Sequence, residues 1–204
     1  MKKRFITLIR KNIIQQYPNY STNKIDTIMY GVESIYLLIT KTIIIFTFAF
    51  FFGILKEMIV LLITFNVIRT VAFGLHANKS WVCLLFSSTI FITATYLCKY
   101  LTIPTTVLYI LYIIAIIFML TFAPADTIKR PIIKKKKRNI FKIVSILVVI
   151  CYFIISLLIE NNLVKNALIL GLLIEIILIN PVTYKMFKLP YNNYKKYSFK
   201  HANV

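Results

Sequence analysis

Acidic residues are scarce in this chain of 204 residues. Six Asp and Glu stand against 25 Lys and Arg, which gives a formal net charge of +19 at pH 7. Only 15% of the residues are charged and 59% are hydrophobic, whereas a soluble domain typically has about 25% charged residues. This balance excludes a soluble globular enzyme, and the long apolar runs exclude a disordered chain. A nucleic-acid-binding protein is also disfavoured, because much of the chain would be insoluble outside lipid.

Cysteine and histidine are scarce as well, with three Cys and two His. Three widely spaced cysteines imply no disulfide framework, and these few residues are too scattered to suggest zinc ligands. We expect no metal and no cofactor. Cys98 and Cys151 are expected to be inert buried thiols, and His201, in a basic tail, a solvated residue. A membrane-embedded protein with short basic connections remains.

Six apolar runs come close to the roughly 20 residues that a bilayer-spanning helix needs. They do not alternate in polarity and are longer than the ~9–11-residue strands of a membrane barrel. We predict an all-α polytopic membrane protein whose six transmembrane helices cover 34–55, 58–75, 81–98, 102–122, 141–159 and 163–180. The whole chain, 1–204, is predicted to form a single integral membrane domain, with 1–33 before the six-helix body 34–180 and a basic tail over 181–204.

Lys and Arg in the connecting segments predict the orientation. With the N-terminus in the cytosol, nineteen of the 25 basic residues lie in cytosolic segments and three in external ones. Both termini and the basic run 134–138 are therefore predicted to face the cytosol. That run is either attracted to lipid headgroups or docks an acidic partner. Within 1–33, apolar residues gather near one helical face, which is typical of an amphipathic helix at an anionic membrane surface. A flexible basic tail is the alternative.

The link between the second and third predicted spans holds His76 and, seven residues later, Cys83. An imidazole in hydrogen-bond reach of a thiol activates it as a nucleophile. On one continuous helix the two residues would lie ~10.5 Å apart along the axis, so a catalytic pair requires a helix break. Gly74 and the turn-forming residues 77–80 can supply it. Spacing alone leaves two interpretations open: a cytosolic Cys–His pair, or an interfacial His and a core Cys.

Three charges fall within predicted spans at similar depth: Lys41 in the first, Arg69 in the second and Glu175 in the sixth. A charge deep in a bilayer costs ~2.5–3.5 kcal/mol on insertion scales, so pairing is expected. Arg69 also shares a helical face with His76. Arg69 therefore either pairs with Glu175 or faces a polar pocket beneath His76.

The segment 69–83 resembles the signature of the accessory gene regulator protein B (AgrB) family. It holds Arg69, a Gly-containing turn, His76 followed by Ala, and Cys83 seven residues after the His. Segment 122–131, Phe-Ala-Pro-Ala-Asp-Thr-Ile-Lys-Arg-Pro, is similar to a second family segment, and Tyr-Gly-Val-Glu at 30–33 also fits. Phe73 departs from the pattern, because many members have the first of two glycines there. The resemblance extends over nearly the whole chain in length and topology.

This resemblance implies a membrane cysteine endopeptidase of Gram-positive quorum sensing and virulence regulation. Its implied partner is the precursor of an autoinducing peptide, of the AgrD type, and a homodimer is implied as well. Cys83 would attack a peptide bond near the C-terminal side of the precursor, and His76 would transfer the protons. The acyl group would be held as a thioester. An internal Cys or Ser of the precursor would then release a thiolactone or lactone ring.

A third catalytic residue is not determined by the pattern. Asp126 is the best acidic candidate for orienting His76, because its loop is predicted on the same side of the membrane. Alternatively, 123–131 is a structured loop whose polar residues pair locally or hold the substrate. The other candidates for orienting the pair or binding the substrate are Arg69, Gly74, Lys129 and Arg130.

A different class of function is a transporter or exporter of a small peptide without proteolysis. Buried charges would then line a pathway. The two functions differ in one observable, since only the protease forms a covalent adduct between Cys83 and the peptide.

Overall fold

The computed structural model describes residues 2–75, 80–127 and 131–195. Within these residues the chain forms helices and no strand. The helices are α1 (Lys2–Gln16), α2 (Thr22–Phe51), α3 (Leu55–Ala72), α4 (Ser80–Tyr100), α5 (Thr105–Phe122), α6 (Lys135–Leu158), α7 (Asn162–Ile179) and α8 (Pro181–Met186). One isolated parallel bridge joins Phe73 to Ala125. The predicted all-α class is confirmed.

Helices α2 to α7 follow the six predicted spans in order, and the differences lie at their ends. The helix α2 begins at Thr22, well before the apolar run at 34, because a helix continues through polar residues as long as its backbone hydrogen bonds can form. The helix α3 ends at Ala72, three residues before the predicted end of its span. That early end leaves residues 73–75 in an irregular conformation, which shapes the candidate site.

Four helices of the described residues are long and apolar enough to cross a membrane: α2, α5, α6 and α7. The helix α3 has 18 residues, three of them charged, at Lys56, Glu57 and Arg69. The helix α4 has 21 residues. Four helices therefore indicate a membrane protein by their length and composition, and the count of six spans stays a prediction.

The chain divides into two compact units, Met1–Thr47 and Phe48–Val204. Within the first unit, α1 and α2 are joined by side-chain contacts. The guanidinium of Arg10 donates to the carboxylate of Asp26 at 2.8 Å. The rings of Phe5 and Tyr36 lie 5.3 Å apart between centroids. These contacts fold α1 against α2, whereas a membrane-surface location of α1 stays a prediction.

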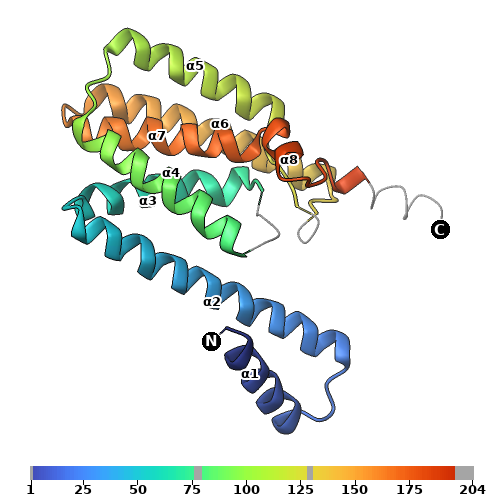
Figure 1. Cartoon of the computed structure of the whole chain (residues 1–204). Helices are drawn as coiled ribbons and strands as arrows, with labels where there is room; N and C mark the ends of the chain where they lie inside the picture. Colours follow the sequence, from blue (N-terminus) through green and yellow to red (C-terminus); the bar gives the residue numbers. More distant parts are fainter. Residues whose placement is uncertain (1, 76–79, 128–130, 196–204) are drawn as a thin grey trace. The chain divides into compact units, whose positions relative to one another are not determined.

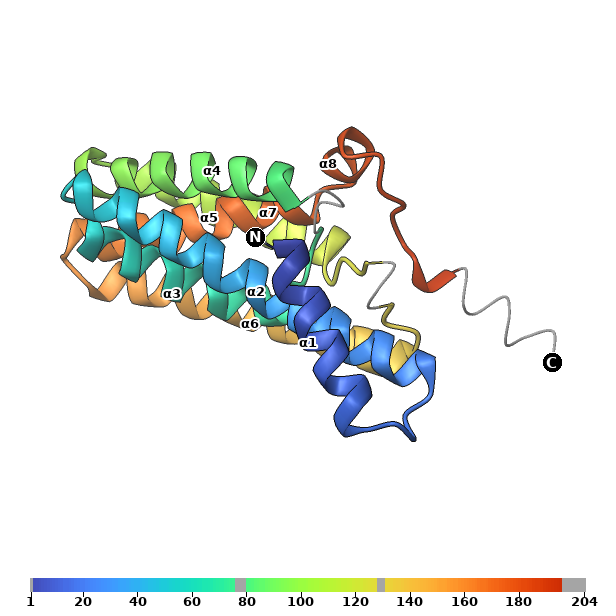
Figure 2. The ribbon, with the colours of Figure 1, turned by 60° about the horizontal axis from the view of Figure 1, so that its bottom comes forward.

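The second unit is built around α7 (Figures 1 and 2), which contacts α3, α4, α5 and α6. Its side chains are buried on nearly every face. A Cβ on Gly171 would lie 3.0 Å from Thr64 Oγ1 and 3.2 Å from the nitrogen of Phe65, so glycine lets α3 pack closely. The Thr64 hydroxyl also donates to the carbonyl of Ala167 at 3.0 Å. Close packing against α7 therefore fixes the position of α3 and of its C-terminal end.

Apolar side chains also cover the outer faces of α5 and α6. The exposed residues include Ile110, Ile113, Ile117, Leu120, Ile143, Leu147, Ile154 and Leu158. A water-soluble helix places polar residues on its outer face, and a large exposed apolar surface marks contact with lipid or another protein. These surfaces therefore agree with a membrane location.

Candidate active site

The helix α3 ends at Ala72 and residues 73–75 after it are not helical, so α3 does not continue into α4, which begins at Ser80. A break between His76 and Cys83 stays a prediction, because residues 76–79 lie outside the described residues. Cys83 lies in α4, three residues after Ser80. His76 and the side chain of Cys83 lie outside the described residues. The structure does describe the residues that hold 73–75, the segment before His76. They are Arg69, Glu175, Leu178 and the loop after α5, which we call the framework.

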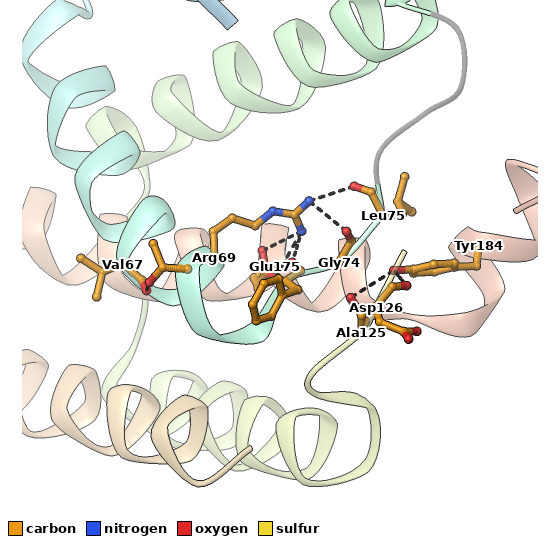
Figure 3. Close-up of polar contacts among 10 residues, drawn as sticks. Val67, Arg69, Gly74, Leu75, Ala125, Asp126, Glu175 and Tyr184 are labelled. Atoms are coloured by element: carbon orange, nitrogen blue, oxygen red, sulfur yellow. Dashed lines mark hydrogen bonds and ion pairs between the residues drawn. The ribbon is translucent and has the colours of Figure 1, made fainter. Parts of the chain in front are cut away.

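The guanidinium of Arg69 occupies the centre of this framework (Figure 3). Its Nη2 donates to the carbonyls of Gly74 at 3.2 Å and Leu75 at 2.8 Å. Its Nη1 donates to the carbonyl of Phe73. Three successive carbonyls after α3 thus converge on one side chain from the last turn of that helix. A guanidinium suits this task, because its donors form a rigid planar fork.

Arg69 also pairs with Glu175, as the first of the two sequence-based alternatives predicts. Nη1 lies 3.4 Å from both carboxylate oxygens. The Glu175 side chain is 0% exposed and that of Arg69 is 15% exposed, so the pair is shielded from solvent. The carboxylate belongs to α7 and thereby anchors the guanidinium to the core helix.

The backbone N–H groups of the same segment are bonded to three different parts of the chain. Phe73 donates to the carbonyl of Arg69 at 3.2 Å, Gly74 to Ala125 at 2.8 Å, and Leu75 to Leu178 at 3.0 Å. In return, the N–H of Ala125 donates to Ala72 at 3.0 Å. The last residues before His76 are thus tied to α3, to α7 and to the loop after α5.

Two residues of this turn have unusual backbone angles. Gly74 has φ +113°, and a Cβ there would collide with the Arg69 guanidinium and lie 3.0 Å from the carbonyl of Leu178. Phe73 has φ 62°, in the left-handed region that favours glycine. Its ring packs edge-on against Phe141, 4.9 Å between centroids. Position 73, where many members of the resembled family have the first of two glycines, therefore has a conformation that suits glycine.

Asp126 is buried, with 3% of its surface exposed, and its carboxylate bonds to the C-terminal segment. Oδ1 accepts the N–H of Asn193 at 2.9 Å, and Oδ2 accepts the N–H of Tyr194 at 2.7 Å. The side-chain amide of Asn193 donates to the Asp126 carbonyl at 3.4 Å. These bonds join the loop to the C-terminal segment, about 67 residues away, and are therefore not pairing within the loop itself.

Tyrosines of the C-terminal segment bond the same loop. The hydroxyl of Tyr184 donates to the carbonyls of Ala125 at 3.4 Å and Asp126 at 3.1 Å (Figure 3). The hydroxyl of Tyr191 donates to the carbonyl of Phe122 at 3.3 Å. Burial, with the nearby Asp126 carboxylate, raises the pKa of Tyr191 to about 12, so this phenol stays a donor at neutral pH. Burial likewise raises the pKa of Tyr184.

The remaining predicted residues are separate from this framework or lie outside the described residues. Cys98 is buried in α4, as expected. The expectation of a buried thiol at Cys151 is wrong, because this residue is exposed on α6. An apolar run does not reveal which residues face outward when all faces are apolar. Lys129, Arg130 and His201 lie outside the description. Among the described residues, no group of three His, Cys, Asp or Glu could hold a metal ion.

Sequence reasoning missed the contribution of residues 181–194. These residues were expected to form the start of a basic tail, yet Tyr184 and Asn193 are buried against the loop after α5. A signal was present, because Pro190-Tyr-Asn-Asn-Tyr194 is poor in charge and rich in aromatic rings for a solvated tail. Leu178 and Ala125 contribute backbone groups, which no side-chain pattern reveals.

These features define an all-α membrane protein in which a buried Arg–Glu pair holds the turn that follows α3. The family model for accessory gene regulator B matches residues 3–179. An AgrB-like protein of Clostridium acetobutylicum is 36% identical over 167 residues, which cover 82% of this chain and 80% of the relative. An AgrB-like protein of Listeria innocua is 34% identical over 83% of each chain.

The accessory gene regulator protein B of Staphylococcus aureus is 30% identical over 183 residues, covering 85% of this chain and 95% of the relative. No solved structure gives a significant match. The chain therefore belongs to the AgrB family. Membership links it to the accessory gene regulator system and implies involvement in the processing of a quorum-sensing peptide.

Proposed function

We propose that this chain is a membrane cysteine endopeptidase that cleaves an autoinducing-peptide precursor through an acyl-thioester on Cys83. The observation that carries the proposal is the break between α3 and α4 in a chain of the AgrB family. A break in this region supports a Cys–His pair, since residues seven apart on one helix are too distant. The start of α4 also favours a thiolate, because the positive end of the helix dipole lies there.

The proposed reaction has two acyl transfers. The Cys83 sulfur attacks the scissile carbonyl while His76 accepts the thiol proton. The C–N bond then breaks, and His76 returns the proton to the leaving amine. In the second step an internal Cys or Ser of the precursor attacks the thioester, which frees Cys83 and closes a thiolactone or lactone. The thioester retains the acyl-transfer potential, so ring closure needs no ATP.

The framework supports roles for the other candidates. Arg69 and Gly74 shape the turn that leads into His76. Asp126 holds the adjoining loop through backbone N–H groups. For Lys129 and Arg130 we propose contacts with the substrate, because they follow Asp126 closely in sequence and the neighbouring Ala125 is bonded to the turn.

Six spans, cytosolic termini and a cytosolic active site complete the proposal. The distribution of Lys and Arg supports this orientation, since basic residues are retained on the cytosolic side. The partners in this proposal are an AgrD-like precursor, the bilayer, with α1 at its surface, and a second copy of the chain. Family membership supports the precursor and the dimer.

Cleavage of the precursor by purified variants tests the proposal. Cys83→Ala and His76→Ala should abolish cleavage, while Cys98→Ala and Cys151→Ala, matched controls for loss of a thiol, should remain active. The substrate to test is a short peptide with an amphipathic N-terminus and an acidic C-terminal tail, sought in the reading frame next to this gene. Cleavage retained by Cys83→Ala would exclude a protease that acts through Cys83. If Cys83→Ala instead transports the peptide into vesicles, the transporter is favoured.

A further inference from the structure

The segment before His76 has no unbonded backbone group. The N–H groups of Phe73, Gly74 and Leu75 donate to three different carbonyls, and their own three carbonyls accept from Arg69. A backbone with all these groups bonded cannot rotate without breaking hydrogen bonds. The direction in which the chain enters His76 is therefore set by the elements that hold this segment.

One of those elements is the loop after α5, and it has no regular structure of its own. Ala125 exchanges two backbone hydrogen bonds with the turn, to Ala72 and from Gly74, at 3.0 and 2.8 Å. Its position therefore determines that of the turn. The loop in turn needs support from outside, since an isolated bridge provides few hydrogen bonds.

The outer support comes from residues 181–194, which we call the C-terminal clasp. Tyr184 is 1% exposed, and its hydroxyl donates to the carbonyls of Ala125 and Asp126. The Asp126 carboxylate accepts two N–H groups from the far end of the clasp. The clasp is thus bonded to the loop at both of its ends.

A contact with α6 holds the far end of the clasp in place. The guanidinium of Arg138 lies 3.2 Å from the ring centroid of Tyr194, within the range of a cation–π interaction. The same helix carries Phe141, which packs on Phe73. The clasp therefore contacts the loop and the loop contacts the turn, while α6 contacts both the clasp and the turn.

We propose that the C-terminal clasp positions His76 toward Cys83, with Tyr184 and Asp126 as positioning residues that do not touch the substrate. This inference rests on the proposed function. Small displacements matter in such a pair, because a shift of ~1 Å can cost about 100-fold in rate. Loss of the Tyr184 hydroxyl would loosen the loop and reduce the rate of the chemical step more than substrate binding.

Two readouts on the full-length protein in detergent test the inference. The first is cleavage of the precursor by Tyr184→Phe, Asp126→Asn and, as a control, Tyr109→Phe, which removes a phenol from the exposed side of α5. We expect kcat to fall about 10–100-fold in the first two with KM nearly unchanged. Tyr109→Phe should retain the parent kcat. Thermal melting of each variant identifies any that has lost its fold.

The second readout is independent of substrate and separates positioning from general stability. In a background of Cys98→Ala and Cys151→Ala, only Cys83 reacts with iodoacetamide. A thiol paired with an imidazole stays reactive at pH 6, whereas an ordinary thiol, whose pKa is about 8.5, does not. The ratio of alkylation rates at pH 6 and pH 9 should fall in Tyr184→Phe toward that of His76→Ala.

The outcomes distinguish the two proposals. If the parent and His76→Ala have the same low rate ratio, no Cys–His pair exists and the proposed function fails together with the inference. If the parent has a high ratio that His76→Ala loses, while Tyr184→Phe and Asp126→Asn keep it along with full kcat, the clasp does not position His76. A folded Tyr184→Phe with a lowered ratio and lowered kcat supports the inference.

Discussion

The Arg69–Glu175 pair offers the sharpest test of how the turn before His76 is held. We consider Arg69→Met, Glu175→Met and the double variant. If the pair alone mattered, removing both partners would harm stability less than removing either one. The structure alters this expectation, because Arg69 also donates to three backbone carbonyls. The arginine and the glutamate are therefore not equivalent.

The expected magnitudes follow from the groups left without partners. Arg69→Met leaves a carboxylate with 0% exposure unpaired, which typically costs ~3–5 kcal/mol. The three carbonyls lose their donor as well, at ~1–3 kcal/mol for each buried group, so at least ~6 kcal/mol is expected in total. Glu175→Met leaves Arg69 with its carbonyls, at about 2 kcal/mol, and the double variant should fall between the two.

Thermal stability in detergent, measured for all four proteins, checks this order. Arg69→Lys serves as a matched control, because a lysine can pair with Glu175 but lacks the planar fork that bonds several carbonyls at once. It should be more stable than Arg69→Met and less stable than the parent. Strictly additive effects of the two single variants would refute the pairing. Full stability and activity of Arg69→Lys would refute the role of the carbonyl bonds.

Three further predictions concern the turn and the orientation. Gly74→Ala should lose stability and cleavage, because its Cβ collides with the Arg69 guanidinium, whereas Gly31→Ala, with open space around it, should be stabilised by up to ~1 kcal/mol in a thermal melt. Phe73→Gly should be more stable than Phe73→Ala by ~1–2 kcal/mol, since both lose the ring but only glycine removes the cost of φ 62°. In a variant without the three native cysteines, an impermeant thiol reagent should not label Lys136→Cys in intact cells, and strong labelling there would reverse the orientation.

The helices could be predicted because each depends on a local pattern. Apolar runs separated by short polar links located α3 to α7 to within a few residues. The Arg69–Glu175 pair could also be anticipated, since two opposite charges at equal depth in apolar helices have few other partners. Phe73 was a visible departure from the family pattern, and its positive φ gives that departure a structural meaning.

The contacts around the turn could not be predicted in the same way. The bonds from Ala125 to Ala72 and from Gly74 to Ala125 join segments about fifty residues apart through backbone atoms, which carry no side-chain signal. The partners of Asp126 are backbone N–H groups in a segment that composition marked as a basic tail. Such a site is assembled by tertiary packing, so its residues are recognised only when the loop, the turn and the C-terminal clasp are seen together.

The central claim is that Cys83 carries the peptide as a thioester, and intact-protein mass spectrometry of the acyl-enzyme tests it most directly. The parent, mixed briefly with the precursor and quenched in acid, should gain the mass of the N-terminal cleavage fragment. Hydroxylamine should remove that mass, since it cleaves thioesters. Cys98→Ala and Cys151→Ala should form the same adduct, and Cys83→Ala should form none. An adduct of equal yield on Cys83→Ala, or precursor cleavage by that variant, would contradict the account.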